Sequence, residues 1–445
     1  MTSKKRLVHR LLKFIDNSPT SFHAVKSSKD ILLANGFQPL HESYEWKLSK
    51  GGRYFVTRDS SAIIAFIVGS DILSHDARFR IVAAHCDSPG LKLKPKPHVD
   101  KYGLGKLSVE PYGGLLLNSW LNRDLGIAGR LITRDSLNML QSRLFYIKES
   151  IFSIPQLAIH LNPNVNDGLA VDKQTQTMPI TGIFADTIAS QQAFEKRLLH
   201  AAEVYSTDRI ISFDISLCDI QPASIGGLDG KLIFAPRLDN LVSCFVGLES
   251  LVSTVDPRDT CVLVCYDNEE VGNLSARGAD SFFLRDVLSR VLVVVNPAGL
   301  NVSQDIFMAF SRSFCISSDM AHATHPHYLD KHEPNHVVQM GKGPVIKSNA
   351  NQRYATTGYS SAVFANLCDQ ASVPYQYFVA RSNMGCGSTV GPTTSAILGI
   401  PTVDIGNPML SMHSVREVSC VSDLVYLKKA FVQFYNQFSF AVLDS

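Results

Sequence analysis

The chain has 445 residues, of which 45% are hydrophobic and 18% are charged. This length and this apolar content are enough for two or three domains with buried cores, and they exclude a disordered or fibrous protein. The 42 Lys and Arg residues nearly balance the 40 Asp and Glu residues. No overall electrostatic field would therefore draw the protein to nucleic acid or to an anionic membrane surface, and we expect small or protein-like partners.

The cysteines and the first residues of the chain indicate the compartment. The nine cysteines are scattered without a CxxC pair, which is typical of reduced, buried thiols. Residues 1–14 (MTSKKRLVHRLLKF) lack the unbroken apolar stretch of a signal peptide, and no apolar run is long enough for a membrane span. We therefore expect a cytoplasmic protein without a membrane anchor. An amphipathic helix packed on the domain is favoured over a targeting helix by Leu7, Leu11, Leu12 and Ile15.

The first ~95 residues predict alternating helices and strands. Thr20 and Ser21 can cap a helix that ends at Gly36, and strands are predicted over residues 61–69 (SAIIAFIVG) and 78–85 (RFRIVAAH). From about Pro95 to Leu232, short alternating runs separated by glycines predict a β-rich segment. These runs are residues 112–120 (YGGLLLNSW), 126–134 (GIAGRLITR) and 154–161 (IPQLAIHL).

The helix and strand pattern returns after Pro236. A helix is predicted from the shared face of Leu241, Cys244, Phe245, Leu248 and Leu251, and buried strands are predicted over residues 261–266 (CVLVCY) and 290–296 (RVLVVVN). The last ~25 residues predict an amphipathic helix, with Leu424, Leu427, Phe431 and Phe434 on its apolar face. We therefore predict an α/β fold whose mostly parallel sheet is covered by helices on both faces. Residues 1–95 and 233–445 would form this discontinuous domain, and residues 96–232 an inserted β-rich domain.

Polar side chains interrupt the ends of the apolar runs, where a parallel sheet binds its ligands. Carboxylates gathered at one sheet edge repel one another unless a cation neutralises them. Imidazole and carboxylate ligands without thiolates suit catalytic Zn²⁺, or Mn²⁺ and Co²⁺, and a shared carboxylate can bridge two ions about 3.5–4 Å apart. The sequence thus predicts a metal site built from His85 and Asp87, Asp239, residues 267–270, and Asp319.

Within this set, two pairs carry more specific expectations. Asp87 lies two residues after His85, so in a strand both point to the same side and the carboxylate can orient the imidazole. Glu269 and Glu270 are adjacent, and only a turn, which Val271 and Gly272 permit, can bring both to one site. One glutamate would then bind metal while the other takes a proton from water. The residues alone do not tell which glutamate has which role.

Two further segments are open to several interpretations. His322, His325 and His327 could be ligands, substrate contacts or hydrogen-bonded loop residues, and the structural role is favoured. Residues 381–399 (RSNMGCGSTVGPTTSAILG) form a glycine-rich loop before a helix. This loop has neither the Walker lysine spacing nor GxGxxG after a strand, so we favour close backbone approach to a substrate over phosphate binding.

A set of longer sequence blocks spans nearly the whole chain. The blocks are HCDSPGLKLKP, YGGLLLNSWLNRDL, RLDN, DNEEVG, SSDMAHATHPHYLDKHEPNH, SNANQRYATT and MLSMHSVRE. Together and in this order they resemble the M18 aminopeptidase family, which includes aspartyl aminopeptidase and the vacuolar aminopeptidase. The resemblance implies a proteolytic α/β domain interrupted by a dimerisation domain. It also implies two metal ions, with Asp239 as the bridge, His85 and Asp319 completing one site, and Glu270 and His413 completing the other.

The resemblance also assigns the groups around the metals. It implies that Glu269 is the general base, which activates the water that attacks the N-terminal peptide carbonyl, and that Asp87 orients His85. The resemblance further implies assembly as a tetrahedral dodecamer built from dimers. A histidine from a neighbouring subunit's inserted domain then reaches the active site, and the matching residue in this sequence is His160. The expected partners are therefore peptides with a free N-terminus and other copies of the chain.

Substrate preference is implied by the same resemblance. Lys347 matches a lysine in the pocket for the first side chain of aspartyl aminopeptidases, and His322 and Tyr354 are the other implied contacts. A cationic pocket favours Asp or Glu. The sequence departs from its bacterial relatives at Asn383, where an Asp is expected, and this departure removes a negative charge near the pocket.

Two alternatives belong to other functional classes. The first is a non-catalytic assembly or cargo-binding protein on the same fold, and the intact set of five ligands with Glu269 favours an enzyme over it. The second is a dimetal carboxypeptidase or deacylase, because a dinuclear site hydrolyses many amides and the fold alone does not fix the substrate. Only the family blocks argue against this second alternative.

Overall fold

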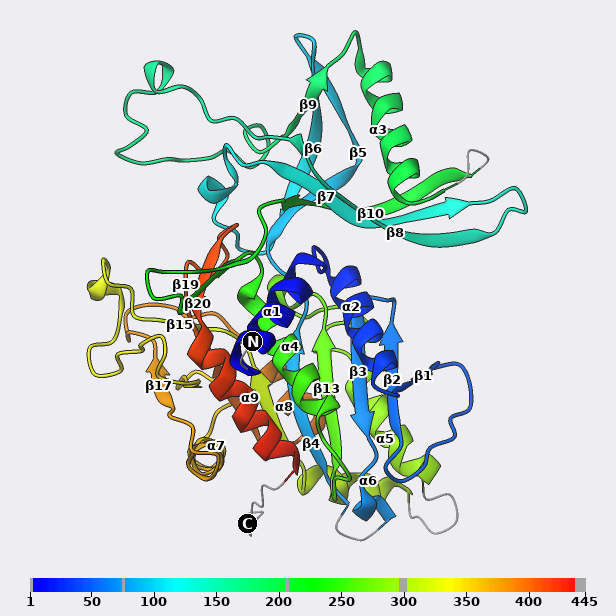
Figure 1. Ribbon diagram of the computed structural model, residues 1–445, viewed down its shortest axis with the longest axis vertical. Coiled ribbons are helices and arrows are strands. Elements are labelled where there is room, and N and C mark those ends of the chain that lie inside the picture. Colours follow the sequence, from blue (N-terminus) through cyan, green and yellow to red (C-terminus); the bar gives the residue numbers. More distant parts are fainter. Residues whose placement is uncertain (1–2, 74–76, 205–207, 296–301, 437–445) are drawn as a thin grey trace.

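The computed structural model describes residues 3–73, 77–204, 208–295 and 302–436. An α/β domain carries a second, β-rich body on one end of its central sheet, and both termini of the described chain lie in the α/β domain (Figure 1). The α/β fold class is confirmed. No helix in the described ranges is both long and apolar enough to cross a bilayer.

Within the described residues, the central sheet of the α/β domain has nine strands. Parallel pairing joins β1 to β2, β13 to β4, β4 to β14, β14 to β18 and β16 to β17, so most of the sheet is parallel. In spatial order the strands are β1 (Gln38–Leu40), β2 (Arg53–Arg58), β3 (Ala62–Ile67), β13 (Thr260–Tyr266), β4 (Phe79–His85), β14 (Phe314–Ser318), β18 (Thr402–Gly406), β16 (Val345–Ser348) and β17 (Gln376–Val379).

Helices bury both faces of this sheet, as its apolar strands predict. In β4, Val82 and Ala84 join the core on one face, while Ile81 and Ala83 join the core on the other. The first core also contains residues of α1 (Ser3–Asp16), α2 (Ser21–Ala34), α4 (Leu238–Val252), α7 (Gly358–Gln370) and α9 (Val421–Asn436). The second core contains residues of α5 (Phe283–Val295), α6 (Val302–Ser311) and α8 (Val390–Leu398).

The β-rich body has a sheet and a core of its own. In the part of this body that is described, six strands pair antiparallel in the order β8-β7-β10-β5-β6-β9. A separate cluster of buried residues, which includes Phe145 and Ile147 of β8, Leu198 of α3, and Trp120, forms the core of this body. The elements are β5 (Gly90–Lys101), β6 (Leu104–Tyr112), β7 (Leu125–Arg134), β8 (Leu140–Phe152), β9 (Ile180–Ile183), α3 (Thr187–Ala201) and β10 (Arg209–Asp219).

A small third sheet lies where the chain returns to the α/β domain. Its order is β11 (Ser224–Gly226), β12 (Leu232–Ala235), β20 (Glu417–Cys420), β19 (Pro408–Leu410) and β15 (Ala321–His322). The domain boundaries at residues 95 and 232 stay a prediction. The strand that crosses the first of them, β5, begins at Gly90, and β12 begins at Leu232.

The predicted N-terminal helix is confirmed, and the predicted C-terminal helix is confirmed over α9, whereas residues 437–445 lie outside the described part of the chain. Leu7, Leu11 and Ile15 of α1 are buried, and so are Leu424, Leu427, Phe431 and Phe434 of α9. The predicted strand over residues 290–296 is wrong, because residues 290–295 complete α5 and residue 296 lies outside the described part of the chain. Leu284, Val287, Leu288 and Val291 are buried at helical spacing. A short run that is apolar at every position satisfies the helical period as well as the strand period.

Two of the short runs in the inserted segment also differ from a β reading. Residues 113–120 form a turn and the 3₁₀ helix η2 (Leu117–Trp120) after β6 ends at Tyr112. Residues 154–161 form a loop with the short 3₁₀ helix η3 (Ile159–Leu161), and Leu157 and Leu161 are exposed. Leu157 and Leu161 belong to an alternating apolar run but are not covered, so the alternation does not indicate burial at these two positions.

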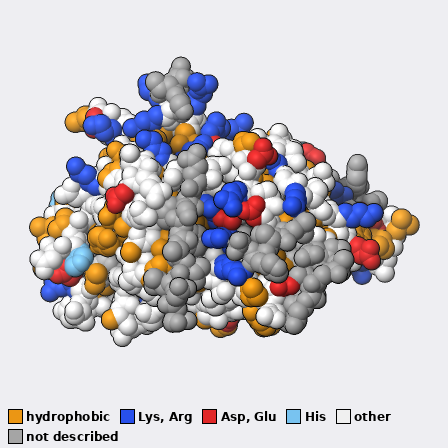
Figure 2. Space-filling model, turned by 90° about the horizontal axis from the view of Figure 1, so that it is seen from below, with side chains coloured by type: hydrophobic (Ala, Val, Ile, Leu, Met, Phe, Trp, Pro, Cys, Tyr) orange, Lys and Arg blue, Asp and Glu red, His pale blue; other side chains and the backbone are white. Residues whose placement is uncertain are grey.

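The face of the α/β domain opposite the inserted body carries no dominant charge among the residues described there. Figure 2 shows basic, acidic and apolar side chains interspersed on this face. This distribution agrees with the near balance of charges in the sequence.

Candidate metal centre

The candidate site lies at the carboxyl ends of three neighbouring parallel strands. β13 pairs with β4, and β4 pairs with β14, in parallel register. His85 is the last residue of β4, residues 267–270 follow β13, and Asp319 follows β14 directly. Parallel strands end at one edge of the sheet, so the sequence places these side chains together, as predicted.

The first cluster is formed by His85, Asp239 and Asp319, all of them buried. His85 Nε2 lies 3.5 Å from Asp239 Oδ1 and 3.4 Å from Asp319 Oδ1. The possible ligand atoms of the three residues lie within 4.8 Å of one another. One side of the site can therefore hold a cation with an imidazole and two carboxylates.

The second cluster is formed by Asp239, Glu270 and His413. His413 Nε2 lies 3.3 Å from Asp239 Oδ2 and 3.3 Å from Glu270 Oε2. His413 has a left-handed backbone conformation, with φ of 67°. Asp239 therefore turns one carboxylate oxygen to each cluster, which is the arrangement that a carboxylate bridging two cations needs.

The two glutamates share a tight turn, the 3₁₀ helix η4 (Glu269–Val271). The turn ends at Gly272, whose φ of +98° is accessible mainly to glycine. The backbone N–H groups of Glu269 and Glu270 each donate to the Asp87 carboxylate over 3.2 Å. Ligand atoms of His85, Glu269 and Glu270 also lie within 4.8 Å of one another. Geometry thus brings both glutamates to the site, as the predicted turn requires.

The electrostatics of the site favour cations. Burial, together with the negative charges of Asp319 and Glu270, raises the pKa of Glu269 to about 9. Burial, together with the charge of Asp239, raises the pKa of Glu270 to about 7. Burial alone would lower the pKa of His413, but the carboxylates of Asp239 and Glu270 raise this pKa to about 11.

Unsatisfied carboxylate oxygens in the site also favour bound cations. Asp239 Oδ1 and Glu270 Oε1 are buried, and neither atom has a hydrogen-bond partner among the residues that the structure describes. An unpaired buried carboxylate oxygen is costly, and a cation bound to it would remove that cost. The donor set, the crowded charges and the two unpaired oxygens therefore fit a pair of divalent metal ions.

Each candidate imidazole ligand is oriented through its second ring nitrogen. His85 Nδ1 lies 3.1 Å from the Asp87 carbonyl oxygen and 3.3 Å from Asp87 Oδ1. His413 Nδ1 donates to the Gly114 carbonyl oxygen over 2.9 Å. These contacts leave Nε2 of both rings turned to the carboxylates, as ligating histidines require.

Glu417 supports both clusters and was not found from the sequence. This buried carboxylate accepts hydrogen bonds from the backbone N–H of Asp239 over 3.1 Å and of His413 over 2.8 Å. Glu417 and His413 belong to the same sequence block, MLSMHSVRE. The sequence shows that Glu417 lies four residues after His413, but it does not show that the Glu417 carboxylate binds backbone N–H groups.

A cleft opens beside the metal centre. Its wall includes Asp239, Glu269, Glu270, Asp319, His322, Lys347, Arg353, Tyr354, Phe378, Gly387 and Ser388. Lys347 is buried, and its Nζ donates to the Met320 carbonyl oxygen over 3.2 Å and lies 3.6 Å from Asp319 Oδ2. The same ammonium lies 5.2 Å from the centre of the Tyr354 ring. Gly387 and Ser388 come from the glycine-rich loop, and Arg353 was not singled out from the sequence.

Other predicted residues lie away from the cleft. His160 is exposed on η3 in the inserted body, and none of its described contacts joins it to the metal clusters. The backbone N–H of His327 donates to His325 Nδ1, and that of His325 donates to His332, which suits loop structure. Asn383 is exposed and is absent from the described residues that line the cleft.

Comparisons with known proteins agree with this geometry. The model of the family described as aminopeptidase I zinc metalloprotease (M18) matches residues 14–435. The chain is 45% identical over 431 residues to a probable M18 family aminopeptidase 2 of Stutzerimonas stutzeri (strain A1501), covering 96% of this chain and 97% of the relative. A protein of the same description from Clostridium novyi (strain NT) is 41% identical over 439 residues, covering 98% of this chain and all of the relative (100%).

Solved structures give the same result. The fold is similar to that in the cryo-EM structure of the Ape4 and Nbr1 complex, with a TM-score of 0.93, 35% identity, and coverage of 97% of this chain and 86% of that chain. It is also similar to the S. cerevisiae mApe1 dodecamer, with a TM-score of 0.83, 26% identity, and coverage of 97% and 96%. The chain therefore belongs to the M18 family of metallo-aminopeptidases.

Proposed function

We propose that this aminopeptidase hydrolyses the N-terminal peptide bond at a dinuclear metal site. The observation that carries the proposal is the position of Asp239, which turns Oδ1 to one cluster and Oδ2 to the other. His85 and Asp319 would hold one ion with it, and Glu270 and His413 the second. When bound, two divalent ions lower the pKa of a water molecule between them and polarise the peptide carbonyl. Family membership and the oxygen and nitrogen donors favour zinc, with Mn²⁺ or Co²⁺ as alternatives.

We assign the proton transfers to Glu269. Its carboxylate belongs to neither of the clusters that share Asp239, yet it lines the cleft beside them. Glu269 would take the proton of the attacking water and then deliver it to the nitrogen of the departing peptide. Asp87 would keep Glu269 in reach of that water, since it accepts the backbone N–H of Glu269. In this way the two adjacent glutamates divide metal binding and proton transfer.

We infer that the cleft prefers an acidic N-terminal side chain. Lys347 and Arg353 supply positive charge to its wall, and His322 and Tyr354 add a ring nitrogen and a hydroxyl. A guanidinium can bind a carboxylate with two hydrogen bonds. Because Lys347 is already engaged with Met320 and lies near Asp319, the exposed Arg353 is the freer of the two cations. Arg353 would therefore contribute most of the selectivity for Asp and Glu.

We propose further that the chain works as a homo-oligomer, as a dodecamer built from dimers. The similar S. cerevisiae mApe1 structure is a dodecamer. The inserted body exposes large apolar side chains, including Tyr102, Leu137 and Ile183, and exposed apolar surface marks interfaces. All nine cysteines are free, which suits the reducing cytoplasm that we propose as the compartment.

A substrate panel tests the proposed activity. We expect release of para-nitroaniline from Asp- and Glu-para-nitroanilide to exceed release from Leu-para-nitroanilide. A chelator should abolish the activity, and added Zn²⁺, Mn²⁺ or Co²⁺ should restore it. An N-acetylated peptide should remain uncut. Cleavage of the acetylated peptide would favour a deacylase or carboxypeptidase, and a lack of all turnover in metal-loaded protein would favour a binding protein.

The proposed contribution of His160 to a neighbouring active site gives a separate prediction. Because η3 is exposed and lies away from the metal clusters of its own chain, His160→Ala should keep metal content and stability. We expect a fall in turnover of about 10-fold or more, as for a lost contact to the reacting peptide. The matched control is His200→Ala, at an exposed histidine of α3 in the same body. Equal turnover of assembled His160→Ala and wild-type enzyme would contradict a shared active site.

A further inference from the structure

Residues 112–114 of the inserted body lie against the metal centre of the same chain. Tyr112 is the last residue of β6, Gly113 and Gly114 follow it directly, and each of the three lies against a residue of the site. We infer that this segment positions both halves of the metal centre, so that the inserted body builds part of the active site within one chain. This inference rests on the dinuclear site proposed above.

The first contact is made by the Tyr112 hydroxyl. It donates to Asp87 Oδ2 over 2.7 Å. Asp87 in turn lies 3.3 Å from His85 Nδ1 and accepts the backbone N–H groups of Glu269 and Glu270. One hydroxyl thus fixes the carboxylate that orients a metal ligand and the turn that carries the general base.

Tyr112 is itself held in place from two sides. Asn268 Nδ2 donates to the Tyr112 oxygen over 3.0 Å, and Lys92 Nζ lies 3.6 Å from the centre of the Tyr112 ring. The hydroxyl therefore accepts from Asn268 while it donates to Asp87, which uses its donor and leaves a single orientation. A tyrosine held in this way can transmit the position of β6 to the site.

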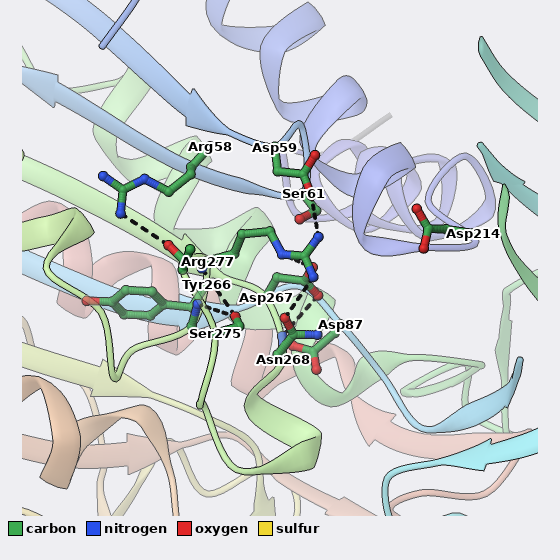
Figure 3. Close-up of polar contacts among 12 residues, drawn as sticks. Arg58, Asp59, Ser61, Asp87, Asp214, Tyr266, Asp267, Asn268, Ser275 and Arg277 are labelled. Atoms are coloured by element: carbon green, nitrogen blue, oxygen red, sulfur yellow. Dashed lines mark hydrogen bonds and ion pairs between the residues drawn. The ribbon is translucent and has the colours of Figure 1, made fainter. Parts of the chain in front are cut away.

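The network continues from Asn268 back to the inserted body. Arg277 donates to Asn268 Oδ1 over 3.2 Å and also pairs with Asp59, as Figure 3 shows. Asp59 binds Arg130 of β7, with 2.7 Å between Nη1 and Oδ1. Arg130 also pairs with Asp214 of β10 over 2.6 Å. Two routes, through Tyr112 and through Arg130, therefore tie the inserted sheet to the loop that begins the η4 turn.

The second half of the site is contacted by the two glycines. Gly113 has φ of +69°, and a Cβ there would lie 3.1 Å from Glu270 Cβ and 3.2 Å from Glu270 O. The Gly114 carbonyl oxygen accepts from His413 Nδ1, and Leu116 N donates to His413 O over 3.0 Å. The absence of a side chain at position 113 thus lets the segment approach the Glu270 and His413 pair closely.

The test uses Tyr112→Phe, which removes the hydroxyl and keeps the ring. Loss of an outer-shell partner of this kind costs about 10–100-fold in metal affinity or activity. We expect metal affinity, measured by chelator competition, to fall within this range, and kcat to fall with KM nearly unchanged. The control is Tyr146→Phe, which removes a hydroxyl from β8 of the same sheet, where the centre of the Tyr146 ring lies 6.1 Å from the centre of the His23 ring. This control should keep wild-type affinity and kcat.

A role confined to domain packing predicts a different outcome. Tyr112→Phe would then lower the melting temperature while metal affinity and kcat stayed at wild-type values, and this result would overturn the inference. If wild-type protein itself bound no metal, the proposed function would fail instead. Gly113→Ala tests the other half of the segment separately, and should weaken binding of one ion by about 10-fold or more. Wild-type affinity for both ions in Gly113→Ala would contradict the contact with Glu270 as a positioning contact.

Discussion

Glu269→Gln should lower kcat by about 100-fold or more while the protein keeps two metal ions per subunit. Glutamine has nearly the shape of glutamate, but its amide cannot accept the proton of the attacking water. Proton transfer to Glu269 stabilises the transition state and not the bound substrate, so KM should change little. Steady-state kinetics on Asp-para-nitroanilide, with metal content measured on the same sample, would check both statements.

Glu270→Gln provides the matched comparison for this prediction. Both glutamates lie within reach of His85, so the distances alone allow either to bind metal. If Glu270 is the ligand and Glu269 the base, Glu270→Gln should lose an ion, whereas Glu269→Gln should lose only turnover. A further control is Glu45→Gln, at an exposed glutamate of the same domain, which should behave as wild type. Loss of an ion from Glu269→Gln with full occupancy in Glu270→Gln would reverse the two roles.

The candidate metal site could be predicted from the sequence because its residues follow the ends of apolar strands. His85 ends β4 and Asp319 follows β14, and these strands are parallel neighbours, so their side chains meet at one edge. A carboxylate that directly follows an apolar run is visible in the residues alone. Asp239 lies at the start of α4 after a left-handed Arg237, and it was indicated by its place after the FAPRL run and by the RLDN block of the family resemblance. The assignment of His413 came from the family resemblance.

The parts that the sequence did not reveal depend on backbone atoms and on chain crossings. The Gly114 carbonyl reaches His413 across 299 positions, and any residue type supplies a carbonyl. Glu417 acts through two backbone N–H groups, which leave no pattern in residue type. The incorrect strand at residues 290–296 has another cause. Its side chains are apolar at successive positions, so burial of a single helical face could not be told from burial of both strand faces.

The inserted body carries two kinds of residue that we expect to act on an active site. It carries Tyr112 and Gly114, which contact Asp87 and His413 within one chain. It also carries His160, which lies apart from the candidate metal site of its own chain. The three residues therefore require different experiments. Loss of the Tyr112 hydroxyl should lower the metal affinity of the protein in any oligomeric state. Loss of His160 should lower only the turnover of the assembled protein.

Asp239→Asn should have the largest effect of any single substitution in the site. The carboxylate presents Oδ1 at 3.5 Å from His85 and Oδ2 at 3.3 Å from His413, whereas an amide has one oxygen and no charge. We therefore expect both ions to bind more weakly and activity to fall by about 1000-fold or more, beyond the 10–100-fold typical of an outer-shell partner.

Asp319→Asn is the comparison that makes the Asp239→Asn result specific to a bridging ligand. Asp319 belongs to only one of the two clusters, so its loss should weaken one ion and leave the second in place. Zinc titration of metal-free protein, followed by calorimetry, would give one remaining tight site for Asp319→Asn and none for Asp239→Asn. Two tight sites in Asp239→Asn would show that the carboxylate does not bridge. Because Asp239 lies at the start of α4, the melting temperature of the metal-free variant would separate a local unfolding from a loss of ligand.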